Sequence, residues 1–169
     1  MAHIAIIGNG ISGVTAARHI RQSSNDRITL ISAETEHFFS RTALMYVFMG
    51  HMEYKHIKPY EDHFWEKNKI DLKFDYVSSI NYSSKELDFQ SGDKLSYDTL
   101  ILAVGSKPNR FNWPGQDLPQ VQGLYSYQKK QIIDFTKLTA ANLFGIFGSV
   151  GSGKSSVLEA ITFALYGKT

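Results

Sequence analysis

Residues 3–20 read HIAIIGNGISGVTAARHI, and this stretch decides the fold. Its β-branched run at residues 4–7 predicts a buried parallel strand. Between this strand and a helix lie Gly8, Gly10 and Gly13, which match GxGxxG in the setting that is typical of dinucleotide binding. The helix is predicted from apolar residues that recur on one face, namely Ile11, Val14, Ala17 and Ile20.

Each glycine of this motif has its own expected role. Gly8 allows a tight turn, and Gly10 lets the backbone approach a pyrophosphate at the helix N-terminus. Gly13 lets helix and strand pack closely. A second strand, Arg27–Ile31, leads to Glu34, which lies 21 residues after Gly13, where a carboxylate commonly accepts hydrogen bonds from an adenosine ribose. The alternative is an ordinary tight turn in an α/β domain, with Glu34 simply exposed to water.

Composition is typical of a soluble globular protein. The chain has 169 residues, 43% hydrophobic and 20% charged, which suffices for one domain with a proper core and is short for two. Its net charge of +2 is too small to indicate nucleic acid or a membrane as a partner. No targeting segment is evident, so we expect a cytoplasmic protein. The absence of cysteine excludes disulfides, thiolate metal sites, iron–sulfur clusters and a redox-active dithiol.

The middle of the chain predicts further strands and a short helix. The apolar run Tyr97–Val104, ended by Gly105, predicts another strand of the central sheet. Residues Pro59–Lys69 predict a short helix whose aromatic side chains pack rather than bind. Short strands separated by turns predict a small antiparallel insert, over Ile70–Phe74, Tyr76–Tyr82 and Glu86–Phe89.

Three histidines near carboxylates raise the question of a metal site. His51, His56 and His63 are spaced by five and seven residues, which places them on no single helical face. Scattered surface histidines therefore explain the pattern better than a set of metal ligands. No side chain in residues 1–127 stands out as a catalytic acid or base.

Two further segments carry a resemblance to a known family. Residues 37–44 read HFFSRTAL, and residues 97–109 read YDTLILAVGSKPN. Together with GNGISG at residues 8–13, they make residues 1 to about 127 resemble the flavoprotein reductases of the pyridine nucleotide-disulfide oxidoreductase family. The likeness is strongest to their cysteine-free branch, which includes rubredoxin and ferredoxin reductases and the nitrite reductase large subunit. This resemblance implies a Rossmann-like domain that binds FAD.

The resemblance also implies roles for individual residues. The three glycines would hold the pyrophosphate, Glu34 the ribose and Arg41 the flavin nucleotide, although an ordinary surface arginine is the alternative at residue 41. Ala103 and Gly105 would close the strand and turn beside the flavin nucleotide, and the backbone of Val77 would touch the adenine. NAD(P)H would be the electron donor, and a small molecule or a small redox protein the acceptor. Without cysteine, the redox chemistry would belong to the flavin.

Residues 143–155 read LFGIFGSVGSGKS and predict a second phosphate site. An apolar strand leads into GxxxxGK(S/T), and a helix with an apolar stripe follows, which is the arrangement of a P-loop. Its amides would wrap a phosphate, Lys154 would reach the β- and γ-phosphate oxygens, and the Ser155 hydroxyl would bind Mg²⁺. The expected ATP-binding set is Gly148, Gly151, Gly153, Lys154, Ser155 and Ser156.

Residues 131–169 resemble the first segment of SMC-like ATPases of DNA break repair, such as the exonuclease component SbcC. The matching parts read IDFTKL, GSGKSS and EAITFALYG. The Walker B carboxylates and the signature motif of such an ATPase do not follow. This segment alone is therefore not expected to hydrolyse ATP.

The sequence thus predicts two parts of an α/β protein. Residues 1–127 form an incomplete FAD-binding reductase domain with a small antiparallel insert, and residues 128–169 form a partial P-loop strand–loop–helix unit. Three hypotheses stay open: the FAD-binding part of a reductase, an ATP-binding module, or a non-catalytic fusion of two gene fragments. Whether the chain is an enzyme also stays open, because a second GxGxxG domain for NAD(P)H does not follow residue 127.

Overall fold

The computed structural model describes residues 1–48, 50–107 and 114 of the chain. It divides the chain into two compact units. The first unit consists of Met1–Ser40 and Lys58–Lys107, and the second includes Arg41–Ile57. The predicted P-loop segment, residues 128–169, lies outside the described residues.

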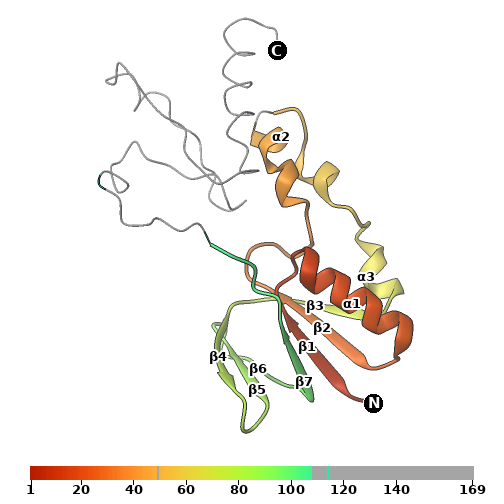
Figure 1. Ribbon diagram of the computed structural model, residues 1–169, viewed down its shortest axis with the longest axis vertical. Coiled ribbons are helices and arrows are strands. Elements are labelled where there is room, and N and C mark those ends of the chain that lie inside the picture. Colours follow the sequence, from red (N-terminus) through yellow and green to blue (C-terminus); the bar gives the residue numbers. More distant parts are fainter. Residues whose placement is uncertain (49, 108–113, 115–169) are drawn as a thin grey trace, which may run out of the picture. The chain divides into compact units, whose positions relative to one another are not determined.

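A parallel sheet organises the first unit. Its strands have the order β3-β2-β1-β7, and every neighbouring pair is parallel (Figure 1). The strands are β1 (His3–Ile7), β2 (Arg27–Ser32), β3 (Ile70–Phe74) and β7 (Thr99–Leu102). The sheet therefore contains all three of the strands predicted for it, with β7 shorter than the predicted run Tyr97–Val104.

The strand β3 corrects one prediction, because we expected Ile70–Phe74 in the antiparallel insert. It pairs with β2 in parallel register, with Ile28 opposite Ile70. A parallel pair needs a long crossover, and the residues between β2 and β3, which include a helix, supply one. Pattern alone marks a strand here but carries no information about its partner.

Helix α1 (Ile11–Ser23) and helix α3 (His63–Lys67) share one face of the parallel sheet. Val14 and Ala17 of α1 are buried against Ile4 and Ile6 of β1, and Trp65 of α3 joins the same cluster. Helix α3 is shorter than the predicted helix. The aromatic residues of this segment pack as predicted: Tyr60 stacks on Phe64 at a centroid distance of 4.4 Å, and both contact the core cluster.

Ile11 is a second correction, since it was predicted on the buried face of α1 but is 68% exposed. It lies in the first turn of the helix, after the end of β1 at Ile7, and it is not among the described residues that form the core cluster. Helical spacing places Ile11 on the same side as Val14, but the core does not extend that far.

A three-stranded antiparallel sheet covers the other face of the parallel sheet (Figure 1). Its strands are β4 (Val77–Asn81), β5 (Glu86–Phe89) and β6 (Lys94–Ser96), in the order β4-β5-β6. Leu87 and Phe89 of β5 pack with Ala5 of β1 and Ile31 of β2. The predicted insert is present, with β6 as a strand that the sequence did not indicate.

The second unit contains short helical elements in its described residues. They are a 3-10 turn (Arg41–Ala43), helix α2 (Leu44–Phe48) and a second 3-10 turn (Tyr54–Ile57). Leu44 and Ile57 are buried. In the part of the chain that the structure describes, no helix has the length and apolar character that a membrane span requires.

Candidate functional site

The carboxyl ends of the parallel strands bring several predicted site residues to one edge of the sheet. Gly8 follows β1, Glu34 follows β2, and Ala103 follows β7. The edge is closed by backbone hydrogen bonds: the amide of Gly8 donates to the carbonyl of Ile31 at 2.8 Å, and that of Ala103 donates to the carbonyl of Ile7 at 2.8 Å. Ligands of open α/β sheets bind outside this edge.

Gly8 and Gly13 have no room for a side chain. Gly8 has φ +111°, and a Cβ there would lie 2.1 Å from the carbonyl oxygen of Ala103. A Cβ on Gly13 would lie 1.9 Å from the carbonyl oxygen of Gly8. The turn, the start of α1 and the end of β7 are therefore packed backbone against backbone.

Gly10 differs from its two neighbours in the motif. It precedes α1 with φ −71° and ψ −177°, and a Cβ built on it would meet no atom of the described residues within 4 Å. The space in front of Gly10 is open, and the first turn of α1 carries no acidic residue. The first turn of this 13-residue helix therefore places no carboxylate of its own beside its N-terminal amides, which suits an anionic ligand.

Glu34 lies just beyond the end of β2 and is half-buried. Its amide donates to the hydroxyl of Ser32 at 3.3 Å, which turns the chain at the sheet edge. The residue that sequence reasoning missed is Asn9, whose side-chain amide donates to the carbonyl of Thr35 at 2.8 Å. The motif leaves residue 9 unspecified, so only the identity of Asn9, a side chain with two N–H donors, could have indicated it.

The remaining predicted residues stand at different places. Gly105 follows β7 with φ +70°, and a Cβ built on it would meet none of the described residues within 4 Å. Val77 begins β4 and packs against the cluster between the two sheets. Arg41 is exposed and begins a 3-10 turn of the second unit, so its assignment rests on resemblance alone. The residues predicted to bind ATP and Mg²⁺, from Gly148 to Ser156, lie outside the described residues.

The three histidines considered for a metal site are exposed. His56 accepts a hydrogen bond from the amide of Glu53 at its Nδ1 atom, at 3.1 Å. Within residues 1–48 and 50–107 there is no cluster of three or more His, Cys, Asp or Glu side chains that could hold a metal ion.

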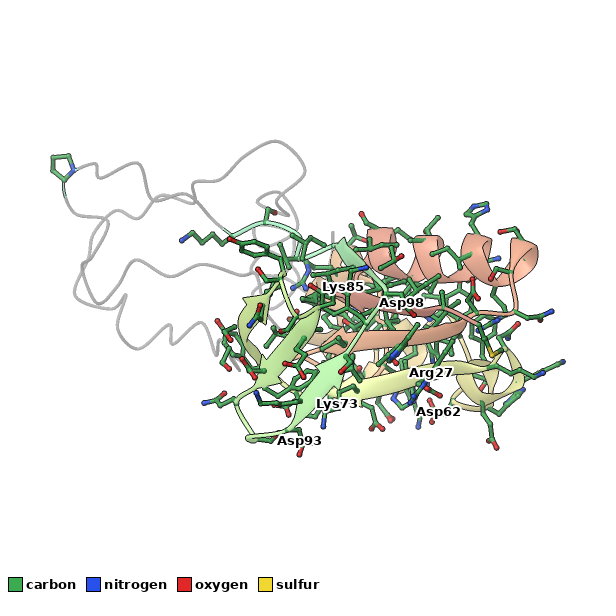
Figure 2. The ribbon with its side chains drawn as sticks, turned by 90° about the horizontal axis from the view of Figure 1, so that it is seen from below. Arg27, Asp62, Lys73, Lys85, Asp93 and Asp98 are labelled. Carbon is green, nitrogen blue, oxygen red and sulfur yellow. The ribbon has the colours of Figure 1, made fainter. Side chains whose placement is uncertain are left out.

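Hydrogen bonds and ion pairs shift the pKa of five described side chains, none of which is a predicted cofactor residue. The hydrogen bond to Asp93 raises the pKa of Lys73, and this pair joins β3 to the turn after β5 (Figure 2). The hydrogen bond from Lys58 lowers the pKa of Asp62. Hydrogen bonds from serine side chains lower the pKa of three further carboxyls, those of Asp26, Asp75 and Asp88.

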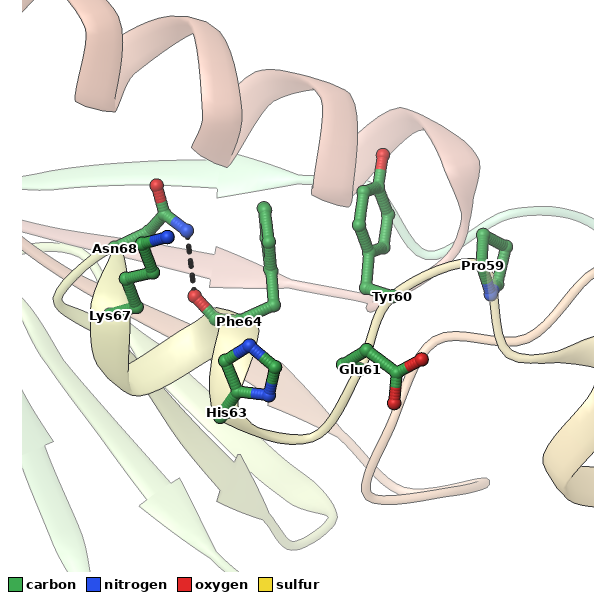
Figure 3. Close-up of a pocket in the computed structure, with 7 residues that line it drawn as sticks. All are labelled: Pro59, Tyr60, Glu61, His63, Phe64, Lys67 and Asn68. Carbon is green, nitrogen blue, oxygen red and sulfur yellow. Dashed lines mark hydrogen bonds between the residues drawn. The ribbon is translucent and has the colours of Figure 1, made fainter.

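A shallow pocket of about 460 Å³ lies beside α3 (Figure 3). The side chains of Tyr60 and Phe64 point toward α1, and Arg18 of α1 lies 5.5 Å from the centre of the Tyr60 ring. None of the residues that line the pocket was predicted to bind a cofactor; they are Pro59, Tyr60, Glu61, His63, Phe64, Lys67 and Asn68. This pocket is therefore separate in its residues from the glycine-rich edge.

Comparison with known proteins supports both resemblances. The family model described as pyridine nucleotide-disulphide oxidoreductase matches residues 2–169. The chain is 30% identical over 132 residues to the ferredoxin–NAD(+) reductase component of the biphenyl dioxygenase system of Paraburkholderia xenovorans, which covers 77% of this chain and 32% of that protein. The chain thus spans about a third of the length of this reductase.

A solved structure has a similar fold over most of this chain. The ferredoxin reductase of the CYP199A2 system of Rhodopseudomonas palustris matches with a TM-score of 0.66 and 26% identity, over 75% of this chain and 32% of that one. A shorter likeness is of a different kind: the chain is 58% identical over 48 residues to the SbcC component of the nuclease SbcCD of Bacillus subtilis, covering 28% of this chain and 4% of that protein.

Proposed function

Because the chain belongs to the pyridine nucleotide-disulphide oxidoreductase family, we propose that residues 1–127 are the FAD-binding part of an NAD(P)H-dependent flavoprotein oxidoreductase. The observation that carries this proposal is the difference among the three glycines. Gly8 and Gly13 are packed so tightly that no side chain fits, while Gly10 faces open space at the N-terminus of α1. A pyrophosphate needs this combination, a rigid turn with an accessible backbone.

The proposed roles follow from this geometry. The amides of the turn and of the first turn of α1 would donate to the pyrophosphate oxygens, and the Glu34 carboxylate would accept from the hydroxyls of the adenosine ribose. Arg41, Val77, Ala103 and Gly105 keep the roles that the family resemblance implies. FAD, when bound, supplies the redox chemistry, accepting a hydride from NAD(P)H and passing electrons on. No side chain of the chain is assigned a catalytic role.

The whole protein's activity is a further part of the proposal, because the chain spans about a third of the reductase it matches. The electron acceptor would be a small redox protein or a small molecule, in keeping with a relative named for the reduction of ferredoxin. The absence of cysteine leaves no thiol in this chain for a disulfide-reductase step. We place the protein in the cytoplasm.

Titration of the purified chain with FAD and with FMN tests this function. We expect FAD to bind at least about 100-fold more tightly, because FMN lacks the second phosphate and the adenosine that the turn and Glu34 would contact. Quenching of flavin fluorescence measures both affinities. Equal affinities for the two flavins, or no binding of FAD, would contradict the proposal.

The second proposal concerns the P-loop segment, and the 58% identity with the SbcC component of the nuclease SbcCD favours it. In this alternative, residues 148–156 bind Mg-ATP, with Lys154 on the β- and γ-phosphates and Ser155 on the metal. The two parts would then be a fusion of two nucleotide-binding segments. If neither part binds its nucleotide, the chain is a non-catalytic fusion of two gene fragments.

The substitution Lys154→Ala separates these outcomes. It removes the charge that would contact the phosphates, so we expect Mg-ATP affinity to fall at least about 30-fold, roughly 2 kcal/mol. Calorimetric titration measures ATP binding, and FAD binding by the same protein should not change. A wild-type chain that releases no heat with Mg-ATP would eliminate the ATP-binding alternative.

A further inference from the structure

Asn9 lies in the turn after β1 and reaches across to the chain that follows β2. Its Nδ2 atom is 2.8 Å from the carbonyl oxygen of Thr35 and 3.4 Å from that of Glu36. A primary amide has two N–H donors, so the single side chain of Asn9 can donate a hydrogen bond to each carbonyl. Asn9 is half-buried and Thr35 is buried, which makes loss of this donor more costly than at an exposed site.

The segment that Asn9 contacts contains Glu34, and it has other contacts of its own. At its end, the Nε2 atom of His37 lies 3.5 Å from the carboxylate of Asp62. The amide of Glu34 donates to the Ser32 hydroxyl, and the Thr35 hydroxyl donates to the carbonyl of His37 at 2.8 Å. These two bonds join residues close together in the sequence. The bonds from Asn9 connect residues 35 and 36 with the glycine turn, across 26 and 27 positions of the sequence, and they add to the bond from the Gly8 amide to the Ile31 carbonyl at the end of β2.

We infer that Asn9 is a positioning residue that holds the Glu34 segment, residues 33–37, at a fixed separation from the glycine turn. The inference rests on the proposed FAD function. The ribose and the pyrophosphate of a dinucleotide are joined covalently, so their two binding groups must stand at a matching separation before the ligand arrives. A segment held in place in the free protein does not lose conformational freedom on binding, and the affinity is higher for that reason.

The chemistry of residue 9 restricts what can serve in this role. An aspartate at this position would present a carboxylate to two carbonyl oxygens and would repel them. A serine hydroxyl is too short to span the same distance and has a single proton. Asn9→Ala and Asn9→Ser should therefore behave alike, and the serine variant serves as a second test if the alanine variant folds poorly.

A double-mutant cycle on the full chain tests the inference. FAD affinity is measured for the wild type, Asn9→Ala, Glu34→Ala and the double variant. We expect each single substitution to raise the Kd for FAD about five- to tenfold. The Kd of the double variant should be at most about twice that of the single variant that binds FAD more weakly. FMN affinity should be the same in all four proteins, because FMN has no adenosine ribose.

Hydrogen exchange in the absence of ligand gives a second measurement. The amides of residues 33–37 should exchange faster in Asn9→Ala than in the wild type, while those of β1 and α1 keep their protection. If the wild type binds FAD and both Asn9→Ala and Asn9→Ser bind it equally well, the inference is wrong and the proposed function still stands. Strictly additive losses in the cycle, or unchanged exchange, would overturn it as well. If the wild type does not bind FAD, both the inference about Asn9 and the proposed function are wrong.

Discussion

Gly8→Ala is expected to lower the free energy of unfolding by about 2–6 kcal/mol. About 1–3 kcal/mol arises because alanine resists the positive φ of this residue, which is +111°. A similar amount, about 1–3 kcal/mol, arises because the new Cβ would lie 2.1 Å from the carbonyl oxygen of Ala103, and backbone atoms must move to relieve the contact. The loss is large against the roughly 5–15 kcal/mol that stabilises a typical domain.

Urea unfolding followed by far-UV circular dichroism measures this loss. Gly10→Ala is the matched control, since it adds the same methyl group two residues away, at φ −71° and in open space. Its free energy of unfolding should fall by no more than about 1 kcal/mol, because residue 10 is the N-cap of α1, where glycine is preferred to alanine. Equal stability of Gly8→Ala and Gly10→Ala would contradict the packing of the glycine turn against β7.

Gly10→Val is expected to abolish measurable FAD binding, with a loss of at least about 100-fold, and to leave the fold intact. A Cβ at residue 10 would meet none of the described residues within 4 Å, so we expect the isopropyl group to be accommodated in the free protein. The same group would stand where the pyrophosphate must approach the turn and would hold the phosphate oxygens away from the amides. The affinity of FAD should therefore fall strongly, while the free chain loses only about 1 kcal/mol of stability, because valine is a poor N-cap residue for α1.

Flavin fluorescence titration and thermal unfolding of the same samples separate the two effects. His19→Val is a suitable control, because it places valine at an exposed position of α1, beyond the turn. That variant should bind FAD as the wild type does. If Gly10→Val retained wild-type affinity for FAD, the pyrophosphate would not lie at this turn.

Local patterns were sufficient for the parts of the fold that depend on neighbours in sequence. The strand at residues 4–7, the glycine turn and the following helix form one continuous pattern, and the structure contains all three. The partner of β3 could not be predicted in this way, because parallel pairing with β2 depends on a crossover of nearly forty residues. The prediction that Ile11 is buried was wrong for a related reason. Helical spacing indicates on which side of a helix a residue lies, but not how far along the helix the core extends.

The residues of the candidate site also differ in whether local sequence could predict them. The glycines and Glu34 belong to a motif whose spacing is set within one strand–helix–strand unit, so the sequence could indicate them together. Asn9 occupies a position that the motif leaves free, and its partners Thr35 and Glu36 are chosen by tertiary structure. Arg41 was predicted from the family resemblance and lies in the second unit, so no sequence spacing relates it to the glycine turn.

The pairing of β1 with β7 also sets an order of events during synthesis. Thr99 lies opposite Ile4, 95 residues later in the chain, and the carbonyl of Ala103 packs against Gly8. Contacts between such distant residues form slowly, since a long loop must close first. A ribosome must therefore release residues 99–103 before the glycine turn can reach its final form. The turn is completed only after α1, α3 and the hairpin of β4 and β5 have emerged.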